Sequence, residues 1–264
     1  MTARLVVLGA GAIVPRAGYG PAGYALEREP EGPITLLDCG PGTLRSLPAA
    51  GFDPVRIERV VVSHFHPDHV LDLFALALYR RIPGIEERVP HLELIGPVGL
   101  ARLVERAPDL LGRAVAFEDF DVREIETDED GFGHCSSGPF DLRCAATGHT
   151  PQALAWRLEA PGMDRLTYSG DSGAQPRLGE LAKGSDVLVI ECSFADGAGT
   201  PNHLTPSGVA TLVRAARPGR VLLTHFYPDT DPAECARQVR DATGAEVSAA
   251  HDGFELKLSR EPGS

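Results

Sequence analysis

The sequence lacks several features that would define a specialised class of protein. Its 264 residues contain no run of about 18 apolar residues, so no segment has the length of a membrane-spanning helix. Basic residues are scarce: 25 Lys and Arg face 37 Asp and Glu, a net charge of −12. That charge repels nucleic acids and anionic membranes unless a local site reverses it. The start, Met1–Leu8, has too short an apolar stretch for a secretion signal.

The cysteines also lack the arrangement of a disulfide framework or a zinc ribbon. There are five, an odd number, and none forms a Cys-x-x-Cys pair. We therefore expect reduced thiols and a cytoplasmic protein. With 43% hydrophobic and 23% charged residues, the composition is that of an ordinary globular chain, which we expect to form a single domain over residues 1–264.

Short apolar runs alternate with helical patterns along the whole chain, which predicts an α/β fold with sheet buried between helices. The expected strands are Leu5–Leu8, Thr35–Leu37, Val60–Val62, Leu92–Ile95, Leu142–Ala145, Ala153–Leu158, Arg165–Ser169, Val187–Ile190, Val221–Thr224 and Phe254–Leu258. The expected helices are Val70–Tyr79, Gly99–Arg106, Val209–Ala216 and Ala233–Ala242.

Two of these helices are preceded by an N-cap residue and a proline. Thr205-Pro206 comes before the first and Asp231-Pro232 before the second, in the order that favours a helix start. The acidic, Gly- and Ser-containing segment Asp121–Pro139 predicts a loop or ragged hairpin.

The most informative segment is Ser63–His69, with the sequence Ser-His-Phe-His-Pro-Asp-His. Three of the nine histidines fall within six residues here, on a loop between a buried strand and a helix. Imidazole and carboxylate together are typical of sites for zinc, manganese or iron. His64 and His66 are two residues apart in extended chain and can share one metal, while Asp68 and His69 can face a second ion.

One loop cannot complete two coordination shells, so further ligands must come from distant segments. His149, Asp171 and His225 each follow an expected strand, and strand ends on one sheet edge converge in space. His91 precedes its strand and is expected to be structural or exposed, and His134 lies in the acidic loop and is expected to be exposed. We leave His251 as a candidate pocket residue.

These residues resemble the metallo-β-lactamase fold, and within it the ribonuclease Z-like branch. The match comprises His64-x-His66-x-Asp68-His69, then His149, Asp171 and His225, with Leu36–Gly40, Tyr168–Asp171, Ile190–Phe194, His203–Thr205 and Asp252-Gly253 as further marks. The resemblance implies a four-layer αβ/βα sandwich with two divalent metal ions, zinc in the first place and manganese or iron as alternatives. It implies that His64, His66 and His149 hold one metal, Asp68, His69 and His225 the other, and that Asp171 bridges them. It also suggests a homodimer.

The sequence departs from ribonuclease Z in one respect. The family carries a protruding arm of several dozen residues that grips tRNA, which we expect between the third histidine and the bridging aspartate. Here His149 and Asp171 are only 22 positions apart, and Arg157 and Arg165 are the only basic residues between them. RNA is therefore disfavoured as a substrate, and we expect a phosphodiester or another small molecule. The secreted β-lactamases usually have cysteine where this chain has Asp171, which argues against a lactam.

The expected activity is that of a dinuclear metal-dependent hydrolase, a ribonuclease Z-like phosphodiesterase without the tRNA-gripping arm. His203, just before a helix start, is our candidate donor of a proton to the leaving alkoxide. Asp68 could orient the attacking water as well as bind metal, and Glu191, at the end of a buried strand, could aim His203.

Three other functions remain open from the sequence. A metal-dependent lactone, ester or thioester hydrolase would use the same fold. A metal-stabilised binding module would need no turnover, although structural zinc sites are usually closed by four protein ligands. Gly170–Gly173 resembles the nucleophile segment of trypsin-like serine proteases, which would require a dedicated histidine and aspartate beside Ser172.

Overall fold

The computed structural model describes residues 3–258 and contains two mixed seven-stranded sheets. The first sheet has the order β14-β1-β2-β3-β4-β5-β6 and the second β13-β12-β11-β10-β9-β8-β7. The strands of the first are β1 (Arg4–Gly9), β2 (Gly23–Glu27), β3 (Ile34–Cys39), β4 (Ile57–Val61), β5 (Leu92–Pro97), β6 (Phe120–Ile125) and β14 (Glu255–Lys257). Those of the second are β7 (Phe132–Ser137), β8 (Phe140–Ala146), β9 (Leu154–Glu159), β10 (Leu166–Tyr168), β11 (Val187–Glu191), β12 (Arg220–Thr224) and β13 (Glu246–Ala249).

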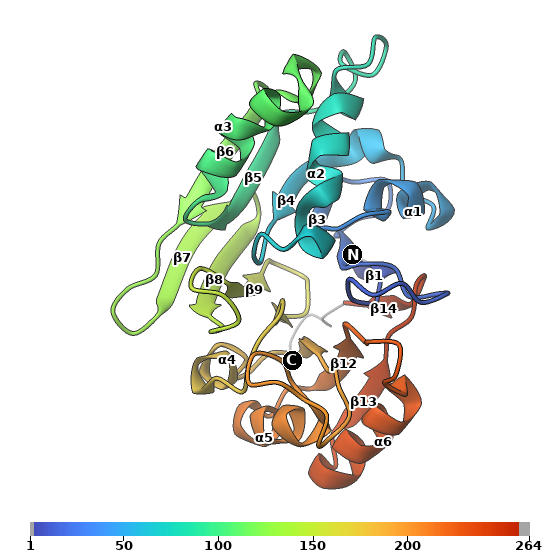
Figure 1. Ribbon diagram of the computed structural model, residues 1–264, viewed down its shortest axis with the longest axis vertical. Coiled ribbons are helices and arrows are strands. Elements are labelled where there is room, and N and C mark those ends of the chain that lie inside the picture. Colours follow the sequence, from blue (N-terminus) through green and yellow to red (C-terminus); the bar gives the residue numbers. More distant parts are fainter. Residues whose placement is uncertain (1–2, 259–264) are drawn as a thin grey trace.

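Helices cover the outer face of each sheet. The first sheet carries α1 (Thr43–Ala49), α2 (Pro67–Arg80) and α3 (Leu100–Leu111), in the upper half of Figure 1. The second carries α4 (Pro176–Leu181), α5 (Pro206–Ala216) and α6 (Pro232–Thr243), in the lower half. The order of layers is helix, sheet, sheet, helix, which confirms the predicted αβ/βα sandwich.

The apolar core lies in three layers because each sheet buries both of its faces. Between the sheets, Trp156 and Tyr24 are among the largest fully buried side chains. The central parallel strands are therefore apolar at successive positions, as at Val187–Ile190 of β11 and Val221–Leu223 of β12, whereas the edge strands β6 and β13 are not. Burial of such side chains stabilises the fold by roughly 1.5–3 kcal/mol each relative to exposure.

The segment Asp121–Pro139 corrects one prediction. Instead of a loop or a ragged hairpin, it forms most of β6 and all of β7, which lie at the edges of two different sheets and do not pair with each other. Its polar residues occur there because edge strands have a solvated side. The sequence also gave no signal for β2, β13, α1 and α4, which are short or, in β2, buried at every position.

The two predicted helix caps have different outcomes. Asp231 accepts hydrogen bonds from the amides of Ala233 and Glu234, as expected for an N-cap. Thr205 occupies the N-cap position of α5 but its side chain caps nothing, and Asp196 accepts from the Ser207 amide instead, at 3.1 Å. Among residues 3–258, no helix has the length and apolar character needed to cross a membrane.

Candidate metal centre

The histidine-rich loop connects β4 to α2 and is held from both sheets. The indole nitrogen of Trp156, on β9, donates to the Val62 carbonyl at 2.9 Å, and the Leu154 amide donates to the Ser63 carbonyl at 2.9 Å. Gly170 lies against this loop with φ of +53°, and a Cβ there would lie 2.6 Å from Ser63 Cβ. These contacts fix the backbone from which His64 projects.

Pro67 begins α2 and places two polar side chains in its first turn. His66 is the N-cap residue, and Asp68 and His69 follow within the helix, both buried. His64 is also buried, whereas His66 is exposed. The proline fixes the turn from loop to helix, so the residues on either side of it face two neighbouring positions.

The other predicted ligands arrive from loops that follow strands of the second sheet. His149 follows β8, Asp171 follows β10, and His225 follows β12 with φ of +60°. All three are buried. The parallel register of β10, β11 and β12 brings the ends of these strands to one edge, between the two halves seen in Figure 1.

The seven predicted ligands form two groups whose donor atoms lie within 4.8 Å of one another in each group. One group contains His64, His66, His149 and Asp171; the other contains Asp68, His69 and His225. Asp171, His203 and His225 form a third combination within the same limit.

Asp171 lies between the first two groups, with one oxygen toward each. Its Oδ2 is 3.8 Å from His64 Nε2 and 3.5 Å from His149 Nε2. Its Oδ1 is 3.2 Å from Nε2 of both His69 and His225. This is the placement that a bridging carboxylate requires.

Four of these buried atoms have no hydrogen-bond partner: Nε2 of His64, His69 and His225, and Oδ1 of Asp171. A buried polar atom without a partner costs about 1–3 kcal/mol. Four buried atoms that lack partners and point toward one another are typical of a cation site. This set of imidazole nitrogens and a carboxylate oxygen therefore fits divalent metal ions.

Neighbouring groups hold the Nδ1 atoms of four histidines, which directs the partnerless Nε2 atoms of His64, His69 and His225 inward. The Nε2 of His149 instead lies 3.1 Å from His66 Nδ1. The Nδ1 contacts are His69 to Asp38 Oδ2 at 2.7 Å, His225 to Ser193 Oγ at 3.0 Å, His149 to the Asn202 carbonyl at 3.0 Å and His64 to Ser63 Oγ at 3.1 Å. Partners of this kind orient metal-binding histidines and set the tautomer.

Burial and charge favour metal-binding forms of His64 and Asp171 but not of His69. Burial acts to lower the pKa of His69, yet the charges of Asp171 and Asp38 raise it well above its usual value, so metal binding there displaces a proton. Burial lowers the pKa of His64 well below its usual value, and the neighbouring His69 adds to this effect, so His64 is a neutral imidazole. Burial acts to raise the pKa of Asp171, but the charges of His225 and His69 outweigh it and lower that pKa well below its usual value. Neutral imidazole and ionised carboxylate are the forms that bind metal.

Asp38 is a residue of this site that the sequence did not reveal. It is fully buried, has φ of +54°, and accepts hydrogen bonds from the Ser63 amide at 2.7 Å and the Tyr168 hydroxyl at 2.6 Å in addition to its contact with His69. Its carboxylate at the end of buried strand β3 was the available signal. Ser193 and Asn202 are hydroxyl and carbonyl partners that carried no signal of their own.

Glu191 contacts His203, as proposed from the sequence. The buried Glu191 Oε1 lies 2.9 Å from His203 Nδ1 and accepts from the Ser172 amide at 2.7 Å. Its Oε2 accepts from the Leu204 amide at 3.0 Å and from the Ser193 hydroxyl. Burial acts to lower the pKa of His203, but the hydrogen bond to Glu191 and its charge raise it above the usual value.

The remaining histidines lie outside this cluster. His91, His134 and His251 are exposed, as predicted for the first two. His134 is on strand β7 and contacts Asp141, and the His251 ring donates from Nδ1 to the Asp252 carbonyl at 2.9 Å.

Ser172 does not have the surroundings of a serine nucleophile. It is fully buried, and its hydroxyl donates to the Gly173 carbonyl at 2.7 Å. Within residues 3–258 no hydrogen bond joins that hydroxyl to a histidine. The serine-hydrolase alternative therefore has no support in the geometry.

Comparisons with known proteins show the family of this chain. The family model described as "Beta-lactamase superfamily domain" matches residues 35–226. An uncharacterized protein of Mycobacterium leprae is 30% identical over 257 residues, covering 96% of this chain and 85% of that protein. Ribonuclease Z of Myxococcus xanthus is 28% identical over 308 aligned residues, covering 97% of each chain.

A solved structure shares the whole architecture. The metallo-β-lactamase fold protein YhfI of Bacillus subtilis superposes with a TM-score of 0.83 at 22% identity, covering 97% of this chain and all of that one. The family match over residues 35–226 spans the strands and loops that bring together the predicted ligands up to His225. The chain therefore belongs to the metallo-β-lactamase superfamily, among metallo-hydrolases whose relatives include ribonuclease Z.

Proposed function

We propose that this protein is a dinuclear metal-dependent phosphodiesterase. The observation that carries the proposal is the set of partnerless buried atoms facing both oxygens of Asp171. His64, His66 and His149 would hold one metal ion and Asp68, His69 and His225 the other, with Asp171 shared between them. When bound, two divalent cations lower the pKa of water and stabilise negative charge on phosphoryl oxygens. Zinc is the proposed ion because imidazole dominates the donor set, with manganese or iron as alternatives.

His203 is proposed as the acid that protonates the leaving alkoxide. Its ring lies 4.7 Å from that of His149 and 5.8 Å from that of His225, so it borders the candidate centre. Glu191 holds its Nδ1 and raises its pKa, which leaves Nε2 protonated for donation. Asp68, with Oδ2 3.5 Å from His225 Nε2, would also orient the attacking water.

The role of Glu191 has its own test. Glu191→Gln removes the charge that raises the pKa of His203, so the alkaline limb of the rate profile should move to lower pH. The profile of kcat against pH measures this shift. An unmoved limb in a folded, metal-loaded Glu191→Gln protein would contradict the positioning role.

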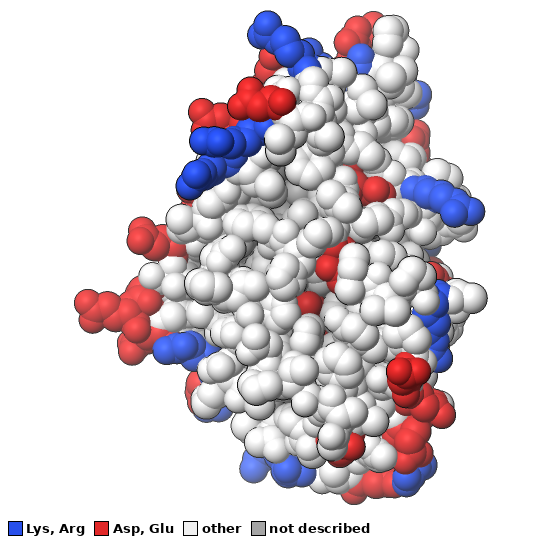
Figure 2. Space-filling view, viewed as in Figure 1, with Lys and Arg blue, Asp and Glu red and all other residues white. Residues whose placement is uncertain are grey.

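The chain between His149 and Asp171 supports a small substrate over tRNA. β9 and β10 both fall in this interval and pair within the second sheet, so these residues form no protruding arm. Figure 2 shows a face whose middle is largely uncharged, with Lys and Arg at its rim. Binding of a polyanion relies on many basic contacts, and this face offers few.

The test is an assay of metal-reconstituted protein against bis-p-nitrophenyl phosphate, cyclic nucleotides, pre-tRNA and a panel of lactones. We expect hydrolysis of the phosphodiesters that EDTA abolishes and added metal restores. Turnover of lactones alone would replace the proposal with the ester-hydrolase alternative. Stoichiometric metal without turnover of any substrate would favour a binding module. We propose the cytoplasm as the compartment because all five cysteines are unpaired.

A further inference from the structure

A groove of about 550 Å³ lies between α2 and α3, next to the histidine-rich loop. This volume is in the range of small-molecule sites. Its lining is mainly aliphatic and aromatic: Phe65, Leu71, Phe74, Val98, Leu103 and Leu110, with Arg102 and Arg106 on α3.

The groove adjoins the candidate metal centre through two loops. Phe65 lies between the proposed ligands His64 and His66 in the chain, and its ring lines the groove. Gln152, three residues beyond the proposed ligand His149, lines it as well. The groove therefore begins beside the two loops that carry proposed ligands of the first metal ion.

Several of the apolar side chains that line the groove are exposed to solvent. Leu71 is 46% exposed, Val98 52% and Leu110 83%. Contiguous apolar surface of this kind usually marks a binding site. Arg102 and Arg106 lie one helical turn apart on α3 and form no ion pair with any residue in the described part of the chain. Figure 2 shows basic and acidic side chains together at the edge of the face over α3. In a protein of net charge −12, two unpaired cations beside an apolar surface favour an anionic, partly apolar ligand.

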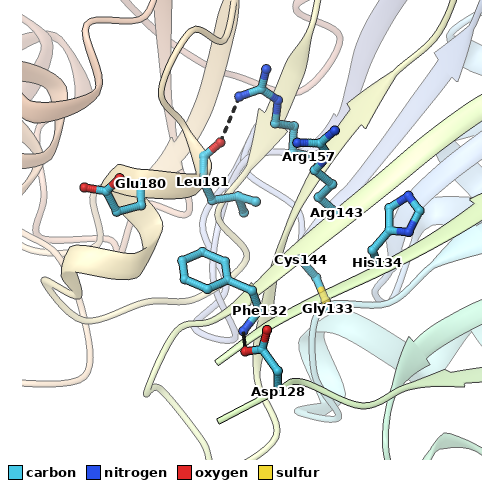
Figure 3. A pocket seen from close by; sticks show the side chains of 9 residues that line it. All are labelled: Asp128, Phe132, Gly133, His134, Arg143, Cys144, Arg157, Glu180 and Leu181. Carbon is cyan, nitrogen blue, oxygen red and sulfur yellow. Dashed lines mark hydrogen bonds between the residues drawn. The ribbon is translucent and has the colours of Figure 1, made fainter. Parts of the chain in front are cut away.

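A second groove, of about 620 Å³, differs in this respect. It lies beside α4 on strands β7 to β9, and Figure 3 shows Arg143 and Arg157 side by side in it. Both already have acidic partners, Asp141 at 3.4 Å and Glu159 at 2.7 Å. Its charges are balanced within the protein, so it has no unpaired group to select an anion.

We propose that the groove between α2 and α3 binds an alkyl substituent of the substrate. The substrate class is then an anionic phosphodiester with an alkyl chain, whose phosphate lies at the metal centre and whose chain lies against Leu71, Val98 and Leu103. Mostly aliphatic walls suit a flexible chain better than a flat ring, which would be favoured by stacked aromatic partners. The inference rests on the proposed phosphodiesterase activity for the position of the phosphate.

The test compares two diesters that share one leaving group, p-nitrophenyl methyl phosphate and p-nitrophenyl octyl phosphate. For the wild-type metal-loaded protein we expect a KM at least about tenfold lower for the octyl ester, because each buried methylene contributes favourably. Leu71→Gln places an amide in the groove and should reduce the ratio of the two KM values toward one. Leu71 is exposed, so this change leaves the core intact.

Leu78→Gln is the matched control. Leu78 is on the same helix, two turns further along, and is 42% exposed, but it does not line the groove. The ratio of KM values should remain at the wild-type level in this variant. Equal KM values for both esters in the wild type would overturn the proposal.

Two further measurements separate the other outcomes. If neither ester is hydrolysed, the phosphodiesterase proposal fails. Calorimetry with octyl phosphate and methyl phosphate, below the micelle concentration, then tests the groove independently of activity. Tighter binding of octyl phosphate that Leu71→Gln removes supports the groove proposal, and equal binding of the two phosphates overturns it. Size-exclusion chromatography tests the homodimer. If Leu71→Gln and Leu78→Gln both convert a dimer to a monomer and neither changes the KM ratio, this face is a subunit contact and the proposal is overturned.

Discussion

The buried polar cluster around Arg59 and the one around Asp171 both join the two sheets, but they differ in whether their polar atoms have partners. Arg59, on β4, donates to Glu93 Oε2 at 3.0 Å, to Thr35 Oγ1 at 3.2 Å and to the Ser137 hydroxyl of β7. No atom of this cluster lacks a partner among the described residues, whereas four atoms around Asp171 do. The polar groups of the Arg59 cluster satisfy one another and stabilise the fold, whereas those of the Asp171 cluster need a cation to be satisfied.

Of the substitutions in the two clusters, replacement of Asp171 with alanine should have the largest effect. Loss of the shared carboxylate removes a ligand from both proposed metal positions, so bound metal should fall below two ions per chain. Hydrolysis should fall by at least about a thousandfold, because bound metals supply several kcal/mol of charge stabilisation. Metal analysis and the bis-p-nitrophenyl phosphate assay measure the two effects. Glu93→Ala is the matched carboxylate control and should retain its metal; a fully metallated, active Asp171→Ala protein would contradict the assignment.

His203→Ala should have the next largest effect, and it also concerns the cluster around Asp171. Loss of a general acid lowers kcat by about 10²–10⁴-fold, while metal content should remain at the wild-type level. The exposed His251→Ala is the control and should leave kcat unchanged. Loss of metal in the His203→Ala protein would contradict the role as an acid. It would indicate that His203 is a metal ligand together with Asp171 and His225.

Arg59→Met tests the other cluster and should act on stability alone. Arg59 is 5% exposed, and its removal leaves Ser137 without a cationic partner and Glu93 with Arg123 alone, at 3.4 Å. The free energy of unfolding should fall by about 3 kcal/mol, with metal content unchanged. Urea unfolding of the metal-loaded proteins measures it. A drop in metal content at unchanged stability would show that the two clusters do not act separately.

The smallest effect concerns acid stability. Burial acts to raise the pKa of Glu93, but hydrogen bonds from Ser137 and Arg59 and the charge of Arg59 lower it below its usual value near 4.5. Because the unfolded chain then binds more protons, this contribution to stability is present above pH 4.5 and is lost as pH falls through the folded pKa. Glu93→Gln should lose that part of the pH dependence of unfolding between pH 5 and pH 3. Identical slopes in both proteins would contradict the ion pair.

The sequence predicted those elements whose signals are local. Apolar runs predicted β3, β4, β5, β11 and β12, apolar spacing predicted α2, and an N-cap residue followed by proline predicted α5 and α6. β7 was not predicted because Phe132–Ser137 contains glycine, histidine and serine, which favour turns over strands. Only the pairing of this segment with β8 makes it a strand. α4 has six residues, too few for a helical pattern to be recognised.

The site divides in the same way. Asp68 and its neighbouring histidines were identified because chemistry is concentrated in one loop, and Asp171 because it follows a predicted strand. Asp38 was not assigned a role, since a single carboxylate at a strand end does not reveal that it will meet His69, 31 residues away, and Tyr168, 130 residues away.

By itself, the sequence determined which residues we propose as metal ligands, the alternation of strands and helices, and the net charge that disfavours nucleic acid. Only the tertiary structure decided that the two oxygens of Asp171 face different histidine groups, that Glu191 holds His203, and that an apolar groove opens beside Phe65. The reason is physical: residue types fix which atoms can bind a cation or lie against an alkyl chain, but the pairing of strands from distant segments fixes which of those atoms meet.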